Sequence, residues 1–154
     1  MSKASPDTAA NPLPYETTIM VRDTCLCLHV QRAARAVARR FDEALRPLDL
    51  TNGQFSLLMS LNRPEPAPMR QVASLLAMDR TTLTANLKPL ERRGLLKIET
   101  DADDRRSKHL TLTRAGRDLM VQAMPIWTAT HAVLDRMVTA TGLDELRTDL
   151  RALS

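Results

Sequence analysis

The stretch that decides the fold is residues 72–113, V-A-S-L-L-A-M-D-R-T-T-L-T-A-N-L-K-P-L-E-R-R-G-L-L-K-I-E-T-D-A-D-D-R-R-S-K-H-L-T-L-T. Two helical patterns come first, followed by a short strand, a charged turn and a second strand. A helix with an uncharged polar face, followed at once by a hairpin with paired arginines, suits a DNA duplex. The helix fits the major groove and the hairpin reaches a neighbouring minor groove. The stretch therefore predicts a winged helix-turn-helix.

The second helix of this stretch is amphipathic. Asp79 is a typical N-cap residue and Gly94 is typical of the position just after a helix, so the helix is expected between them. At about 100° per residue, Leu83, Leu87 and Leu90 share one face and form a core stripe. The opposite face combines small hydroxyls with long cations, which suit base edges and phosphates. That face consists of Thr81, Ala85, Lys88 and Arg92, flanked by Thr82 and Thr84.

A charged turn between two expected strands, residues 95–99 and 108–112, completes the wing. An arginine at the tip, Arg106, suits a narrow and electronegative minor groove. We expect Asp104 to hold Arg106 by a hydrogen bond, because a bare carboxylate beside DNA would be repulsive. The candidate DNA contacts of helix and wing together are Arg80, Thr81, Thr82, Thr84, Ala85, Lys88, Arg92, Asp104, Arg105, Arg106 and Lys108.

The flanking segments predict a division of the chain into four parts. Residues 1–20, with three prolines, are expected to form a flexible arm, and residues 21–50 a dimerisation helix that begins at position 21 or 23 and ends near position 45. Residues 51–113 make up the DNA-binding unit, in which the Pro-rich segment 63–68 is a stiff, non-helical linker. Residues 114–154 are expected to form C-terminal dimerisation helices. The expected fold is therefore mainly α with a small β-hairpin wing.

Local signals mark the helices around the decisive stretch. Residues 51–54 have capping-box spacing and start a short helix, and residues 69–76 form the next one, with Val72, Leu75 and Leu76 facing inward. Thr113 can cap the long helix that follows.

Two prolines, Pro89 and Pro125, fall inside expected helices. Each removes a backbone donor and is expected to bend or loosen its helix. A single sequence does not tell what purpose Pro89 serves.

Charge is concentrated where the DNA contacts are expected. The 154-residue chain has a formal net charge of +4, while residues 63–117 alone hold twelve Lys/Arg and seven Asp/Glu, a net +5. A basic middle between near-neutral flanks indicates a polyanion partner. A winged-helix module that binds protein instead of DNA is the less favoured alternative, because this basic excess coincides with the helix and the wing.

Other function classes lack their signals. Two cysteines cannot build a disulfide framework, no apolar run reaches the roughly 18 residues of a membrane span, and the N-terminus lacks a secretory pattern. No Gly-rich phosphate loop, paired-carboxylate site or nucleophile elbow is visible, and the three histidines have no metal-ligand spacing. We therefore expect a cytoplasmic protein that is not an enzyme and binds no cofactor, metal or membrane.

At this point the chain resembles the multiple-antibiotic-resistance regulator (MarR) family of bacterial winged-helix repressors. The resemblance rests on M-D-R-T-T-L-T at 78–84, L-E-R-R-G-L at 90–95, and the family pattern Asp-x-Arg, five residues, Leu-Thr. Asp104, Arg106, Leu112 and Thr113 meet that pattern. The order of elements is similar from about Asp23 to the C-terminus. The resemblance implies a nucleoid-associated bacterial homodimer with intertwined terminal helices that binds a pseudo-palindromic operator on double-stranded DNA, usually as a repressor released by a small ligand.

The release signal has two candidate sites. In the common mode of the family, an aromatic or phenolic ligand binds between the dimerisation helices and the DNA-binding unit, where His29, Arg32 and Trp127 could line a cleft. The family's organic-hydroperoxide sensors instead carry a reactive cysteine, whose matching position is Cys27.

This chain departs from those sensors around the thiol. Tyrosines support the thiolate there, and the corresponding positions hold Gln31, Phe41 and Asn52. His29 and Arg32 are near in sequence and could still favour a thiolate. Redox switching through Cys27 is therefore kept as the alternative to ligand release.

Overall fold

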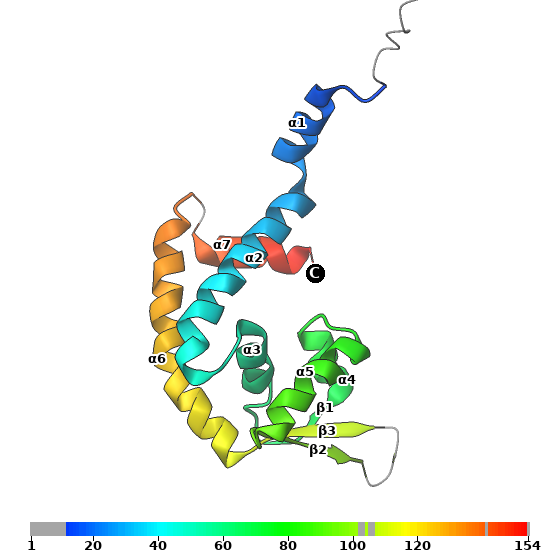
Figure 1. The fold of residues 1–154 in the computed structure, drawn as a ribbon, viewed down its shortest axis with the longest axis vertical. Coiled ribbons are helices and arrows are strands. Elements are labelled where there is room, and N and C mark those ends of the chain that lie inside the picture. The colour runs from blue at the N-terminus through cyan, green and yellow to red at the C-terminus, as the bar shows by residue number, and fades with distance from the viewer. Residues whose placement is uncertain (1–11, 102–103, 105–106, 141, 154) are drawn as a thin grey trace, which may run out of the picture. The chain divides into compact units, whose positions relative to one another are not determined.

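The computed structural model describes residues 12–101, 104, 107–140 and 142–153. The chain divides into two compact units, Met1–Ala36 and Val37–Ser154, which are described separately. The elements in chain order (Figure 1) are α1 (Tyr15–Thr24), α2 (Leu26–Leu45), the 3₁₀ turn η1 (Arg46–Leu48), α3 (Asn52–Ser60), β1 (Ala67–Pro68), α4 (Met69–Leu75), α5 (Arg80–Arg92), β2 (Leu96–Thr100), β3 (Lys108–Leu112), α6 (Arg114–Met137) and α7 (Leu143–Ala152). No helix in this described part is long and apolar enough to cross a membrane.

The first helix begins earlier than the sequence predicted. The expected arm covered residues 1–20, yet α1 starts at Tyr15, directly after Pro14. Pro14 is the last proline of the expected arm, and no residue between it and position 20 opposes a helix. The Thr17 amide already donates to the Pro14 carbonyl. A break at Cys25, with φ −71° and ψ 103°, separates α1 from α2. The predicted single helix is therefore two.

The predicted helix caps are confirmed. The Thr51 side chain accepts from the Gln54 amide while the Gln54 side chain accepts from the Thr51 amide, which is a complete capping box. The Asp79 carboxylate accepts from the Thr82 amide at the start of α5, and Gly94 follows the helix with φ 69°. Both internal prolines are accommodated within continuous helices, α5 and α6.

The sheet has one strand more than the predicted hairpin. Its order is β1-β3-β2, with both pairs antiparallel. Ala67 pairs with Leu110 and is fully buried, whereas Pro68 pairs with His109 at the sheet edge. Proline is tolerated on an edge strand because the missing amide faces away from the ladder. The Pro-rich segment is non-helical as expected, but its last two residues belong to the sheet.

Leucines from four helices and the sheet make up the core of the larger unit. Leu83, Leu87 and Leu90 are all completely buried, as their spacing predicted. The inward orientation of Leu75 was wrong, since this side chain is 70% exposed. In α4 the stripe that meets the core contains Met69 and Val72, and Leu75 lies about 60° of helix rotation from Val72 and about 120° from Met69.

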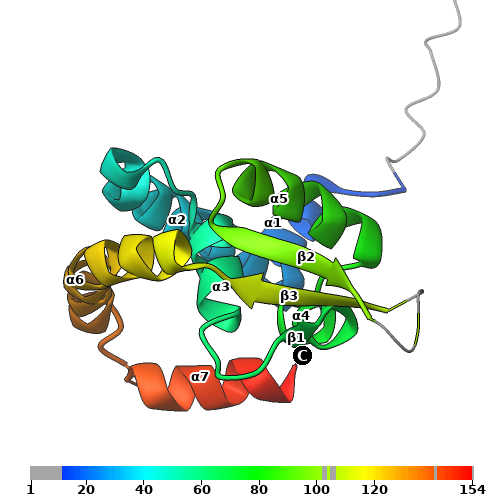
Figure 2. The ribbon, with the colours of Figure 1, turned by 90° about the horizontal axis from the view of Figure 1, so that it is seen from below.

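Helix α3 occupies the middle of this unit. It packs against α6 on one side and α4 on the other, and both views show this order (Figures 1 and 2). The strands β2 and β3 continue from the end of α5 into α6 (Figure 2). The elements α4, α5, β2 and β3 are thus joined to α6 both through α3 and through the sheet.

The junction between the sheet and α6 is tightly packed. The Thr113 hydroxyl accepts a hydrogen bond from the Gly116 amide and donates one to the Gly94 carbonyl. The Thr113 amide donates to the Leu95 carbonyl. Gly116 lies so close to Leu95, just before β2, and to Leu112 of β3 that an added Cβ would clash with the Leu95 oxygen and lie 2.7 Å from Leu112 Cδ1. Only glycine allows this approach of helix to strand.

We predict that Gly116→Ala destabilises the protein by about 1–3 kcal/mol, because the methyl group forces backbone and core to shift. Gly53→Ala is the matched control, since its Cβ would meet nothing nearer than Thr51 Oγ1 at 4.0 Å. The control should be stabilised by up to ~1 kcal/mol, because alanine is the better helix former. Urea unfolding with an unchanged m-value measures both changes. Equal midpoints for the two variants would contradict the packing argument.

Candidate nucleic-acid interface

The exposed face of α5 carries the helix residues predicted to contact DNA. With Leu83, Leu87 and Leu90 turned into the core, the side chains of Thr81, Ala85, Lys88 and Arg92 are all exposed. A shallow hollow of about 350 Å³ lies along this face, lined by Arg80, Thr81, Thr84, Ala85 and Lys88. Small side chains at its centre leave the backbone open to a close approach.

The three threonines of this face differ in their hydrogen bonds. The Thr82 hydroxyl donates to Asp79 Oδ2 at 2.6 Å, and the Thr84 hydroxyl donates to the Arg80 carbonyl at 2.7 Å. The Thr81 hydroxyl has no partner within the described part of the chain. Thr81 is therefore available as both donor and acceptor, whereas Thr82 and Thr84 offer only their acceptor lone pairs.

Asp79 is held in its charged form at the start of α5. Hydrogen bonds from the Thr82 side chain, and then from the Thr82 amide, lower the pKa of this carboxyl below its ordinary value. The charge also compensates the positive end of the helix dipole. Asp79 thus orders the first turn of the helix, which presents Arg80 and Thr81.

The wing is described up to its tip. Its turn is closed by hydrogen bonds from the Asp101 amide to the Ser107 carbonyl and from the Ser107 amide to the Asp104 carbonyl. Asp101 Oδ2 lies 3.4 Å from His109 Nδ1, a pairing that the sequence did not reveal. Arg105 and Arg106, and with them the expected bond between Asp104 and Arg106, lie outside the described residues.

A second hollow, of about 590 Å³, joins the wing to the helix-turn-helix. Three predicted residues, Arg80, Asp104 and Lys108, lie on it. Arg70 and Gln71, from the first turn of α4, line the same hollow. Arg70 was not among the residues predicted from the sequence. The signal that the sequence offered was an arginine two residues after Pro68, at the start of the expected helix 69–76.

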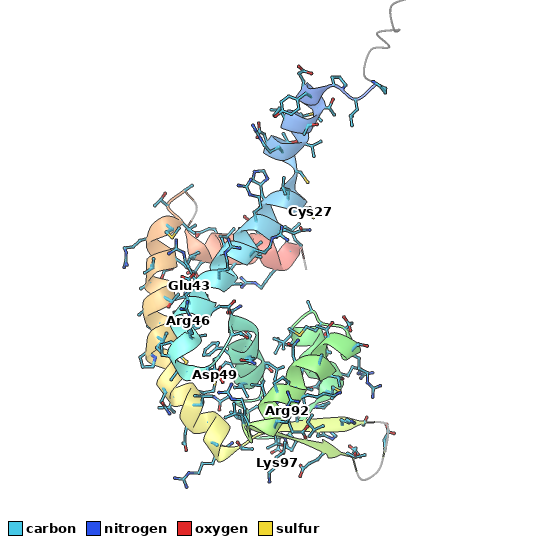
Figure 3. All side chains as sticks on the ribbon, viewed as in Figure 1. Cys27, Glu43, Arg46, Asp49, Arg92 and Lys97 are labelled. Atoms are coloured by element: carbon cyan, nitrogen blue, oxygen red, sulfur yellow. The ribbon has the colours of Figure 1, made fainter. Side chains whose placement is uncertain are left out.

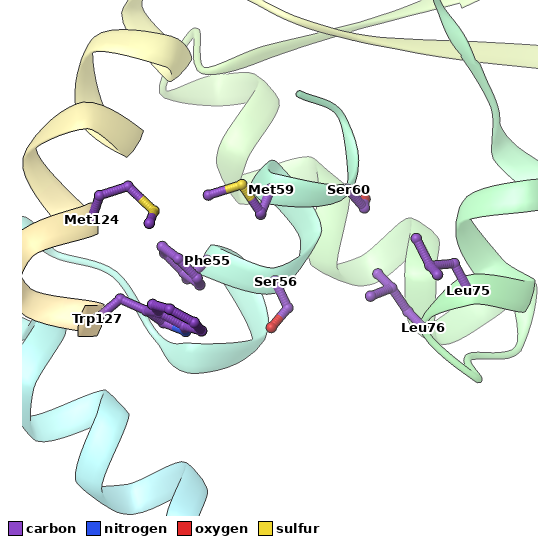
Figure 4. Close-up of a pocket in the computed structure, with 8 residues that line it drawn as sticks. All are labelled: Phe55, Ser56, Met59, Ser60, Leu75, Leu76, Met124 and Trp127. Atoms are coloured by element: carbon purple, nitrogen blue, oxygen red, sulfur yellow. The ribbon is translucent and has the colours of Figure 1, made fainter. Parts of the chain in front are cut away.

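An apolar pocket of about 540 Å³ lies on the other side of α4. Figure 4 shows Trp127 and Met124 of α6 beside Phe55 of α3, with Leu75 and Leu76 across the opening. The Phe55 and Trp127 rings are stacked, with 17° between their planes and 6.3 Å between centroids. The remaining lining residues are Ser56, Met59 and Ser60.

The three predicted ligand residues belong to two different compact units. Trp127 lines this pocket, whereas His29 and Arg32 belong to the other compact unit. His29 Nδ1 lies 2.8 Å from the Cys25 carbonyl, and Arg32 is exposed.

The predicted redox residue lies near the start of α2 (Figure 3). Cys27 is exposed and its Sγ accepts a hydrogen bond of 3.2 Å from Gln31 Nε2, while Cys25 is partly buried. No group of three His, Cys, Asp or Glu side chains among the described residues could hold a metal ion.

Comparisons with known proteins agree with this geometry. Residues 50–108 match the model of the MarR family. The HTH-type transcriptional regulator TtmR of Methylorubrum extorquens (strain PA1) is 35% identical over 97 residues, which cover 63% of this chain and 50% of TtmR. The chain therefore aligns with about half the length of this curated relative.

Two solved structures of regulators with DNA resemble the chain over most of its length. The transcriptional regulator MosR of Mycobacterium tuberculosis, solved in complex with DNA, is 35% identical with a TM-score of 0.75, covering 84% of this chain and 92% of MosR. The transcriptional repressor CouR, bound to a 23-mer DNA duplex, is 31% identical with a TM-score of 0.68, covering 83% and 89%. The winged helix, the position of its basic face and these similarities together establish that the chain belongs to the MarR family.

Proposed function

We propose that this protein is a transcriptional regulator that binds a pseudo-palindromic operator on double-stranded DNA. The observation that carries the proposal is the convergence of Arg70, Arg80 and Lys108 on one hollow beside the exposed face of α5. In this arrangement α5 enters a major groove, and the cations around the hollow meet the phosphates that flank it. The regulators MosR and CouR, solved with DNA, support this assignment by analogy.

The exposed apolar side chains support a homodimer. All of the large ones in the described residues lie before residue 27 or after residue 120, with Leu75 as the exception. The first group is Leu13, Tyr15, Met20, Val21 and Leu26, and the second is Val121, Met124, Met137, Leu150 and Leu153. Exposed apolar surface of this kind is covered by association. A second copy, related by two-fold symmetry, supplies the second α5 that a palindrome needs.

We predict that Arg70→Ala and Arg80→Ala each weaken binding to every duplex and reduce the slope of log K against log[salt] by about 1, because each removes one phosphate contact. The probe is a duplex selected by the wild-type protein from a random library, with a shuffled duplex for comparison. Arg136→Ala, an exposed arginine near the end of α6, is the matched control and should leave the slope unchanged. Wild-type slopes in both variants would remove the hollow from the interface.

The apolar pocket supports release by a small aromatic ligand. Its stacked Phe55 and Trp127 suit a flat ring, and none of its lining residues is charged. Burying an unpaired charge there would be costly, so the enclosed part of the ligand is uncharged.

Two of the residues that line the pocket are also close to the start of α5 in the sequence. Leu75 and Leu76 form its α4 side, and only Ala77 and Met78 separate them from the cap Asp79. Ala77 holds φ 49°, a strained conformation for a residue with a side chain. A ligand that displaces Leu76 therefore acts directly on the start of α5 and weakens DNA binding. The protein is then a repressor that the ligand releases from DNA.

We predict that methyl benzoate quenches the fluorescence of Trp127, the only tryptophan of the chain, more strongly than benzoate does, and weakens operator binding. Leu75→Arg should abolish the quenching and the ligand response but keep DNA binding, because the guanidinium occupies the opening. Ser74→Arg is the matched control, as Ser74 is exposed on the same helix but lies outside the pocket lining. Quenching that survives in Leu75→Arg would show that the ligand binds elsewhere.

A redox switch at Cys27 is the second candidate. The thiol is exposed, and the Gln31 amide donates to its sulfur, at the position where the resemblance implies a tyrosine hydroxyl in peroxide sensors. The thiolate is the reactive form of a cysteine. The thiolate would attack an organic hydroperoxide, forming the sulfenate and releasing the alcohol.

In that case we predict that cumene hydroperoxide releases operator DNA from the wild type and from Cys25→Ser, but not from Cys27→Ser. Gel shifts at increasing peroxide measure the release, and mass spectrometry locates the added oxygen. Release from all three proteins would exclude Cys27 as the switch.

A further inference from the structure

Arg93 joins the C-terminal end of α5 to the corner between α2 and α3, which lies far earlier in the chain. It is the C-cap residue of α5, and its side chain reaches residues 44 and 45 positions earlier. Nη1 donates to the Asp49 carbonyl at 2.5 Å and Nη2 donates to the Leu48 carbonyl at 3.3 Å. Among the hydrogen bonds of the described residues, only those of Arg93 join the α5 segment to this corner.

The corner itself is a well-defined turn between α2 and α3. The 3₁₀ turn Arg46–Leu48 ends at Asp49, which is left-handed with φ 52° and ψ 45° (Asp49 is labelled in Figure 3). The Asp49 amide donates to the Arg46 carbonyl, and the turn packs against α6. The Leu48 and Asp49 carbonyls lie at the end of a helical segment, where backbone acceptors lack partners within the helix. The guanidinium supplies two donors to them at once.

The carbonyls, and not the carboxylate, are the essential partners. Asp49 Oδ2 lies 3.6 Å from Arg93 Nη1, but the Asp49 side chain is 94% exposed and the Arg93 side chain 30%. An ion pair with one partner so exposed is weak, because water screens it. A planar, forked donor that spans two successive carbonyls fixes direction as well as distance, which a lysine cannot do.

The neighbouring Arg92 provides the contrast. It is exposed on the proposed DNA face and has no partner within the described part of the chain. About 100° of helix rotation separates the two side chains, so one cation faces the groove while the other faces the protein. The adjacent arginines therefore have different tasks.

We propose that Arg93 is a positioning residue, which sets the orientation of α5 relative to the α2–α3 corner and α6 and so determines sequence-specific binding without touching DNA. The proposal rests on the DNA-binding function proposed above. Three leucines hold the buried face of α5, and Asp79 orders its start. The forked guanidinium of Arg93 fixes the C-terminal end of α5, so that the helix axis cannot swing along the groove.

The test compares Arg93→Ala, Arg93→Lys and Arg92→Ala on the duplex selected by the wild-type protein and on a shuffled duplex, over a range of salt. We expect Arg93→Ala to lower the ratio of specific to nonspecific affinity on the order of tenfold, the effect of losing charge-assisted hydrogen bonds. Its nonspecific affinity and salt slope should stay at the wild-type values. Arg92→Ala should instead weaken both affinities and reduce the slope by about 1.

Two further measurements separate positioning from stability. Arg93→Lys retains the charge but not the fork, so it should fold normally by circular dichroism and still lose specificity. Asp49→Asn tolerates the left-handed turn and keeps both carbonyls, so it should bind as the wild type does.

Four results would overturn the proposal. A reduced salt slope in Arg93→Ala would mean direct contact with phosphate. Full specificity in Arg93→Lys would mean that charge alone suffices. Wild-type specificity in Arg93→Ala, with the wild-type protein itself discriminating the two duplexes, would refute the positioning role while leaving the proposed function intact. A wild-type protein that does not discriminate the duplexes would refute both.

Discussion

Burial of three leucines on one side of α5 is the constraint on which the rest of the structure depends. Leu83, Leu87 and Leu90 are inaccessible to water, and each contributes about 1.5–3 kcal/mol relative to an exposed position. Any rotation of α5 about its axis would expose them. The helix therefore has only one orientation about that axis, and its polar face is exposed as a consequence.

The surroundings of α5 extend this one orientation into a surface. Asp79 orders the first turn, and the Thr113–Gly94 bond joins the end of the helix to α6 through the sheet. The hollow beside the wing then collects cations from three separate elements, α4, α5 and β3. A phosphate backbone is attracted by such a cluster whatever its sequence, whereas the exposed threonine face is the part suited to reading bases.

The proposed DNA contacts and the proposed ligand pocket involve opposite ends of the short helix α4. Arg70 in its first turn lines the basic hollow, and Leu75 at its end lines the apolar pocket. A seven-residue helix with a single buried stripe is held by few side chains, mainly Met69 and Val72. Its end is thus the part of the DNA-binding unit that a small ligand can displace at low energetic cost.

The sequence by itself determined the features that depend on near neighbours in the chain. The caps at Thr51, Asp79 and Thr113, the glycine after α5 and the leucine stripe are all local, because a helix repeats every 3.6 residues. The wing pattern and the family resemblance followed from the same short segments.

Only the tertiary structure decided what lies next to what. Ala67–Pro68 becomes a strand because β3 offers an edge, and Leu75 is exposed because the core reaches only one side of α4. The contact of Arg93 with Leu48 and Asp49 joins positions more than forty residues apart. Such contacts arise when separate elements pack, and no local periodicity encodes them.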